Sequence, residues 1–182
     1  MKRKTAKEIL AESFRELAGK KKADKITVGD IAGNCGYSTT TFYRHFRDKY
    51  DLIVWDHTQY VAEIMEKIGK NGYSWNNTLL EGMRYYQENK EYLANLLRYT
   101  SGHDSFVRYM TEINCSALTK FILKNISADR LDEETEMYVR IYCSGTTMLN
   151  CEWILGRYSV TPEELALIHE KALPEPLRKY LY

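Results

Sequence analysis

The sequence predicts an all-α protein of about nine helices, with a three-helix head of the helix-turn-helix type followed by a larger helical bundle. Apolar residues recur at helical spacing along most of the 182 residues, and no alternating run of strand length competes with them. Only three prolines are present, and a proline in a helix interior breaks the helix. These observations together favour helices throughout the chain.

The first expected helix runs from about Thr5 to Leu17 or Lys20. Its apolar face consists of Ala6, Leu10, Phe14 and Leu17. Residues at these spacings lie on one side of a helix, so they are the expected contacts with the rest of the head. Gly19 and the lysines that follow it end the helix.

The second and third expected helices are short and are joined by a glycine turn. Thr27 followed by Asp30 has the spacing of a capping box, which starts the second helix. Gly36 permits the left-handed backbone of a tight turn. Ser38 then caps a third helix over Thr39–Phe46. A helix, a turn with glycine and a second helix form the arrangement of a DNA-binding helix-turn-helix.

The remaining residues continue the helical pattern. A fourth, long helix should begin at Lys49 after an Asp48 cap and continue to about Lys67 or Gly69. Later helices are expected after caps at Ser74, Asp104, Asp132 and Thr161 and around Leu93–Leu97, with breaks at Gly69–Gly72, Ser101–Gly102, Gly156 and Pro174. Helices of this length and apolar content predict a bundle.

The charge distribution supports a division at residue 50, into a DNA-binding domain (1–50) and a regulatory and dimerisation domain (51–182). Residues 1–50 hold twelve Lys/Arg and six Asp/Glu, whereas residues 51–182 hold fourteen Lys/Arg and nineteen Asp/Glu. A basic end on an acidic remainder is typical of a protein that places one end on a polyanion. The alternative is chance clustering, with Lys20–Lys22 as a solvated helix end.

Several function classes lack support in the sequence. No segment approaches the ~20 apolar residues of a membrane-spanning helix, and no signal peptide precedes the first helix, so we expect a cytoplasmic protein with no membrane partner. The four cysteines and four histidines show no zinc spacing, so neither a metal nor another cofactor is expected. A small helical enzyme with an aromatic pocket would need a catalytic constellation, and none is recognisable.

The third expected helix has an outer face suited to a DNA groove. With Phe42 facing the core, Thr40 and Arg44 lie nearly opposite, and Thr41 and Tyr43 lie on the flanks, since each residue turns the helix by about 100°. Thr can contact a thymine methyl group, Arg can bind guanine with two hydrogen bonds, and Tyr can reach a phosphate. The alternative is a solvated polar face on a small three-helix unit.

Lys49 stands in the first turn of the fourth expected helix, where the helix dipole disfavours a cation. A phosphate docked on that helix N-terminus would compensate for the misfit.

Three segments of the head carry a specific resemblance. They read TVGDIA at Thr27–Ala32, GYS at Gly36–Ser38 and TFYRHFRDKYDL at Thr41–Leu52. This pattern resembles the signature of the TetR family of transcriptional regulators, and the resemblance covers about residues 5–55. It implies an all-helical, cytoplasmic, non-enzymatic homodimer that binds a palindromic double-stranded DNA operator through two such heads.

The resemblance also implies roles for individual residues. Thr27 and Ser38 correspond to positions that contact phosphates, and Lys49 to one that clamps the DNA backbone. The positions expected to face DNA are Thr39, Thr40, Thr41, Tyr43 and His45, together with Arg44. Thr40 departs from the family pattern, which often has glycine there for close approach to DNA, so the operator sequence stays open.

Residues 51–182 resemble the family more loosely. Trp75, the pair Leu79–Leu80 and the segment Met83–Tyr92 are similar to the branch that includes activators of dihydroxyacetone kinase operons. This resemblance implies control by a small-molecule or protein effector, and it leaves open whether the output is repression or activation. A helical protein-interaction module without sequence-specific DNA binding remains the alternative function.

Two features of this half each have two interpretations. The tyrosines of residues 85–142 either line an effector pocket or edge an ordinary helical core. The small residues Ser144–Thr147 allow close helix approach, either to a second copy of the chain or within one subunit.

Overall fold

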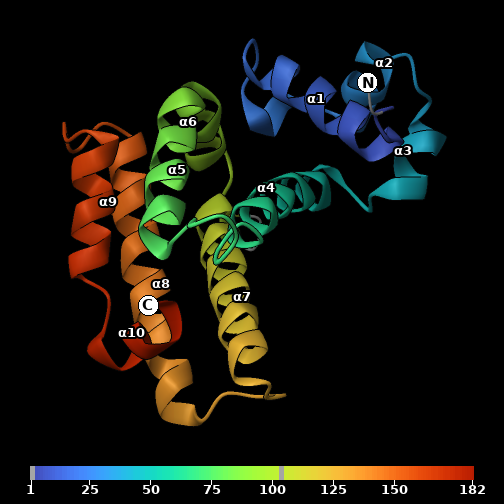
Figure 1. Ribbon diagram of the computed structural model, residues 1–182. Coiled ribbons are helices and arrows are strands. Elements are labelled where there is room, and N and C mark those ends of the chain that lie inside the picture. Colours follow the sequence, from blue (N-terminus) through green and yellow to red (C-terminus); the bar gives the residue numbers. More distant parts are fainter. Residues whose placement is uncertain (1–2, 103–104) are drawn as a thin grey trace.

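The computed structural model describes residues 3–102 and 105–182, and within them it is all α, with ten α-helices, one 3-10 turn and no strand (Figure 1). The elements of the head are α1 (Ala6–Ala18), η1 (Ala23–Lys25), α2 (Val28–Asn34) and α3 (Thr39–His45). The others are α4 (Lys49–Met65), α5 (Trp75–Glu88), α6 (Lys90–Tyr99), α7 (Phe106–Ile126), α8 (Glu133–Ile154), α9 (Pro162–Lys171) and α10 (Glu175–Leu181). The predicted fold class is therefore confirmed.

The helix starts follow the predicted caps. Full capping boxes form at Thr5, Thr27, Ser74 and Thr161, and the Asp48 and Asp132 side chains accept backbone N–H groups at the starts of α4 and α8. The predicted Asp104 cap lies outside the described residues. Local sequence signals therefore fix where most of the helices begin.

Two short elements were not predicted. Helix α9 ends at Lys171, three residues before Pro174, and α10 begins immediately after that proline and buries Leu177 and Leu181 against the bundle. The 3-10 turn η1 lies in the lysine-rich segment that was expected to be a plain connection, and it buries Ala23. Both elements are too short to show helical periodicity, so only packing against the bundle or the head reveals them.

The head has its own small core. Phe14 of α1 and Phe42 of α3 are fully buried, and the Ser13 hydroxyl donates to the Ile31 carbonyl of α2 at 2.7 Å. Gly36 has φ +74°, in the left-handed region that the tight turn between α2 and α3 requires. These contacts pack the three helices of the head on one another.

The other helices form the body of the molecule (Figure 1). The long helices α7 and α8 pack along each other, α9 packs on α5, and α10 contacts α7 and α8. Met110, Ile122 and Ile154 are among the fully buried core residues, with exposures of 0–1%. Helix α4 belongs to both regions, since it packs against α1 at its beginning and against α5 and α7 further along.

The head is fixed to the body by polar contacts from two helices. Arg15 of α1 binds the Asp56 carboxylate of α4 through two hydrogen bonds, with Nε to Oδ2 at 2.8 Å, and Asp56 is 6% exposed. From α6, the Asn95 amide nitrogen donates to the Ala18 and Lys21 carbonyls, and its oxygen accepts the Ala23 N–H at 2.9 Å. Bidentate pairing and a fully used amide both fix orientation as well as position.

We predict that Asp56→Ala lowers the free energy of unfolding by about 2 kcal/mol, since it leaves Arg15 without its charged partner. The loss is smaller than for a fully buried pair because 39% of the Arg15 side chain is exposed. Urea unfolding measures it. As a control, Lys20→Ala breaks the exposed pair with Glu16 and should cost under about 0.5 kcal/mol. Equal losses in the two variants would show that the Arg15–Asp56 pair does not join head and body.

Candidate nucleic-acid interface

Helix α3 presents the polar face that the sequence predicts. Ser38 starts the helix by accepting the Thr41 N–H at 3.1 Å, and Phe42 anchors it in the head. The side chains of Thr39, Thr40, Tyr43 and Arg44 are exposed, with Tyr43 at 59%. The structure therefore brings four of the predicted DNA-facing residues together on one surface.

The remaining residues of that prediction lie at the edges of the surface. Thr41 and His45 are half-buried, and the Thr41 hydroxyl lies 3.0 Å from the Ser38 hydroxyl. The Tyr43 ring packs edge-on against Phe42, with centroids 5.6 Å apart. This contact holds the phenol of Tyr43 in a fixed direction at the helix surface.

Thr27 and Ser38 are the N-cap residues of α2 and α3 and are both exposed. The Thr27 side-chain oxygen accepts the Asp30 N–H at 3.0 Å, and Asp30 in turn accepts the Thr27 N–H. The carboxylate of Asp30 also binds the Lys21 ammonium, and this contact and the Thr27 hydrogen bonds lower the pKa of Asp30 to about 2. The capping hydroxyls are thus held in place by local bonds.

Lys49 has a structural role that the sequence does not reveal. Its ammonium donates to three backbone carbonyls of the η1 region, those of Ala23, Asp24 and Ile26, each at 2.9 Å. These bonds tie the beginning of α4 to η1, the same turn that Asn95 holds from α6. No local pattern marks this contact, because its partners are main-chain atoms more than twenty residues away.

Two other cations of the head lie near α3. The Arg47 side chain pairs with Asp48 at 3.2 Å and is largely exposed. The Lys7 ammonium stands 5.2 Å from the centre of the Phe46 ring and 5.5 Å from that of Trp55. Arg44 forms no ion pair with any residue in the part of the chain that the structure describes. The surface therefore offers cationic donors for phosphate or base edges.

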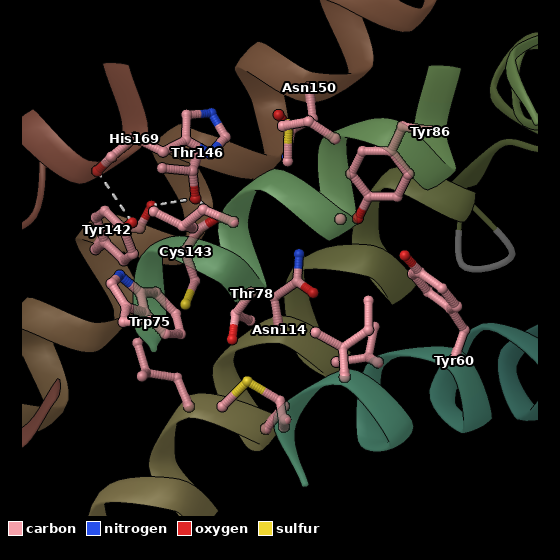
Figure 2. A pocket seen from close by; sticks show the side chains of 18 residues that line it. Tyr60, Trp75, Thr78, Tyr86, Asn114, Tyr142, Cys143, Thr146, Asn150 and His169 are labelled. Carbon is pink, nitrogen blue, oxygen red and sulfur yellow. Dashed lines mark hydrogen bonds between the residues drawn. The ribbon is translucent and has the colours of Figure 1, made fainter. Parts of the chain in front are cut away.

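The body contains a cavity bordered by α4, α5, α7, α8 and α9, with Tyr60, Trp75, Tyr86, Tyr142 and His169 among its lining residues (Figure 2). Of the predicted tyrosine cluster, Tyr86 and Tyr142 line it, whereas other members pack elsewhere. Within the described ranges, no group of three or more His, Cys, Asp or Glu side chains is placed to hold a metal ion. Nor does any described helix combine the length and apolar character needed to cross a membrane.

The basic head has three helices, and one of them is an exposed polar helix that follows a glycine turn. This arrangement defines the class of helix-turn-helix DNA-binding regulators. Comparison with protein families narrows this class. The family model described as "Bacterial regulatory proteins, tetR family" matches residues 10–54, and one described as "Transcriptional regulator C-terminal region" matches residues 73–174. The chain belongs to the TetR family of transcriptional regulators, which are not enzymes.

Individual relatives agree with this assignment. The dhaKLM operon transcriptional activator DhaS of Lactococcus lactis subsp. lactis is 30% identical over 82 residues. The sequence match covers 45% of this chain and 43% of the relative, so it spans less than half the length of that protein.

Solved structures show the same fold along nearly the whole chain. The dihydroxyacetone kinase operon activator DhaS superposes with a TM-score of 0.67 at 20% identity, over 97% of this chain and 98% of that one. A TetR transcriptional regulator from Rhodococcus sp. RHA1 gives 0.65 at 18% identity, over 91% and 94%. The TetR family repressor AlkX from Dietzia sp. gives 0.56 at 16% identity, over the full length of both chains.

We predict that Lys49→Met lowers the free energy of unfolding by about 2 kcal/mol, because three carbonyls lose a charged donor. Urea unfolding followed by circular dichroism measures the change. Lys25→Met is the control, since the Lys25 side chain is 70% exposed and pairs only with its neighbour Asp24. A Lys49→Met variant as stable as the control would contradict the structural role of Lys49.

Proposed function

We propose that the protein acts as a homodimer on a palindromic operator, with α3 of each subunit in the major groove. The observation that carries this proposal is the exposed face of Thr39, Thr40, Tyr43 and Arg44 on α3. In this arrangement the domain of residues 1–50 binds DNA and that of residues 51–182 provides dimerisation and control.

Different residues of the head would contact different parts of the DNA. Arg44 and Thr40 would read base edges, and Tyr43 would reach a phosphate. Thr27 and Ser38 would donate their hydroxyl hydrogens to phosphates at the rim, and Thr39, Thr41 and His45 would complete the surface. For Lys49 we propose that the bonds to η1 place the first turn of α4 beside the DNA backbone.

The dimer would form through α8 and α9. Helix α8 exposes a stripe of apolar residues, and α9 exposes two more beside it. The α8 stripe consists of Met137 (59% exposed), Ile141 (67%), Met148 (52%) and Leu155 (42%), and the α9 pair is Leu167 (48%) and Ile168 (44%). An apolar face of this kind on two neighbouring helices is typical of a four-helix contact between identical subunits.

Within the small-residue segment of α8, Ser144 and Gly145 are exposed next to this stripe, whereas Thr147 is fully buried and accepts a hydrogen bond from Asn114 of α7. If the dimer forms as proposed, Ser144 and Gly145 would approach the second copy of the chain, whereas Thr147 packs within one subunit.

Control of DNA binding would act through α4. This helix has 17 residues, about 25 Å of rise, and connects Lys49 at the head to Ile64 and Met65 at the cavity. DNA half-sites lie about 34 Å apart, so a modest swing of α4 in each subunit would spoil simultaneous docking of the two heads. A structure with bound effector whose head spacing equals the DNA-bound spacing would refute this mechanism.

We predict selective binding to an operator, tested first by titrating the protein with its own upstream region against random competitor DNA at two salt concentrations. Tyr43→Ala and Arg44→Ala should each weaken specific binding about tenfold or more, and binding should fall as salt rises. Tyr182→Ala is the matched control, because Tyr182 is equally exposed (63%) and lies at the far end of the chain.

The outcomes separate the alternatives. Salt-sensitive binding without preference for the upstream region would move the search to other genomic fragments. If a folded dimer bound neither random DNA nor any genomic fragment, the protein-interaction module would replace the operator-binding function.

We predict that Ile141→Asp converts the dimer to a monomer, because a carboxylate would be desolvated at the centre of the apolar stripe. Sedimentation velocity at micromolar concentration measures the change in mass. Ile126→Asp, at an exposed apolar position at the end of α7, should leave the mass unchanged. A dimer that survives Ile141→Asp would place the interface elsewhere.

A further inference from the structure

The cavity in the body is bordered by helices that are far apart in the sequence. Its lining comes from α4, α5, α7, α8 and α9, and its volume is about 110 Å³. Figure 2 shows aromatic rings on opposite sides of it, with Trp75 and Tyr142 on one side and Tyr60 and Tyr86 on the other. The aliphatic and thioether side chains of Ile64 and Met83 complete mainly apolar walls.

Three buried polar atoms of the lining have no hydrogen-bond partner. They are Nε1 of Trp75, Oδ1 of Asn150 and Nε2 of His169, in residues that are 5%, 4% and 2% exposed. Across residues 3–102 and 105–182, only one other buried side-chain nitrogen or oxygen, Nε2 of His57, is unpartnered in this way. A buried polar atom without a partner lowers stability, so three at one cavity call for an explanation.

The occupant that these atoms would suit is uncharged. The lining contains no Asp, Glu, Lys or Arg among the described residues, so a charged group would have no counter-ion there. Burial lowers the pKa of His169 to about 4, and its imidazole is therefore neutral at pH 7. A neutral imidazole nitrogen donates or accepts according to its tautomer, and adapts to either kind of partner.

The size of the cavity restricts the occupant further. A cavity of about 150 Å³ lined by apolar side chains holds a benzene molecule, so 110 Å³ suits a single six-membered ring or a smaller molecule. The Asn150 carbonyl oxygen needs a donor, and the neutral imidazole of His169 lies on the same side of the cavity (Figure 2). A hydroxyl group suits both, because it can donate to the Asn150 oxygen and either donate to or accept from the His169 nitrogen.

We propose that this cavity is a binding site for a small, uncharged, single-ring hydroxyl compound, held by Asn150 and His169 between aromatic walls that include Trp75. The identification of this compound with the effector rests on the proposed function, whereas the binding site itself does not. Among the described residues, the protein itself supplies no hydrogen-bond partner for Oδ1 of Asn150 or Nε2 of His169. Binding satisfies them, so the ligand stabilises the folded state.

Phenol and benzyl alcohol are the probes for the full-length protein, and calorimetry gives their affinities. Both should bind at millimolar concentration or better and raise the melting temperature as their concentration rises. Benzoate, of similar size but charged, should bind at least tenfold more weakly than benzyl alcohol. Toluene, which leaves the polar atoms unpartnered, should also bind more weakly.

Asn150→Leu separates a ligand-binding role from a structural one. It removes an unpartnered oxygen without removing a bond to it, so it should raise the melting temperature of the empty protein and weaken phenol binding at least tenfold. Asn125→Leu is the matched control at a residue of α7 outside the cavity lining, where the amide bonds the Tyr180 carbonyl. It should leave phenol affinity unchanged.

A second variant fills the space itself. Gly82 of α5 borders the cavity, and a Cβ placed there would meet no atom within 4 Å. Gly82→Leu should therefore fold, with better helix propensity than glycine, and should weaken phenol binding at least tenfold.

The proposal is overturned if neither alcohol binds at millimolar concentration, if benzoate binds as well as benzyl alcohol, or if both cavity variants keep full phenol affinity. The effect of phenol on operator affinity is a separate measurement, made by titrating the operator at saturating phenol. Phenol binding that leaves operator affinity unchanged would uphold this site and refute its identification with the effector, whereas failure of DNA binding alone would leave the site intact.

Discussion

The orientation of the head relative to the body depends on the ion pair between Arg15 and Asp56. A three-helix head of this size has a small core and little surface to share with the body, so its orientation needs directional bonds. The bidentate pair fixes α1 against α4, and the Asn95 amide holds the turn η1 from α6. The direction of α3 therefore follows the position of α4 and α6 rather than that of a flexible linker.

Lys49 supplies a third polar contact that fixes the head, and its partners differ from the phosphate that the sequence suggests. A cation in the first turn of a helix is unfavourable for that helix, and from the sequence we relate this misfit to a phosphate. In the structure three carbonyl oxygens of η1 solvate the ammonium instead. Lys49 thus joins the turn η1 of the head to α4, so a displacement of α4 would move the head as well.

Sequence patterns predict the parts of this structure that depend on neighbours in the chain. Capping boxes such as those of Thr27 and Thr161, the glycine turn at Gly36 and the exposed face of α3 all involve residues within about five positions of each other. The contacts of Asn95 and Lys49 join residues 23 to 77 positions apart through backbone carbonyls, which no side-chain pattern encodes. The sequence offers tyrosines for a pocket, and two of them, Tyr86 and Tyr142, line the cavity. The rest of the lining could not be predicted, because it comes from five helices whose packing must be known first.

Helix α4 carries residues of both the cavity and the Arg15–Asp56 ion pair. Tyr60 and Ile64 border the cavity, and Asp56 and His57 lie one turn earlier, where His57 packs between Tyr86 and Phe106. Burial and the charge of Arg15 lower the pKa of His57 to about 4, so this stretch of α4 is neutral and apolar apart from the Asp56 pair. A ligand shifts an equilibrium only by its difference in affinity for the two states. Tyr86 contacts both the cavity and His57, so a ligand that orders Tyr86 would favour one position of α4, and through Asp56 and Lys49 one orientation of the head.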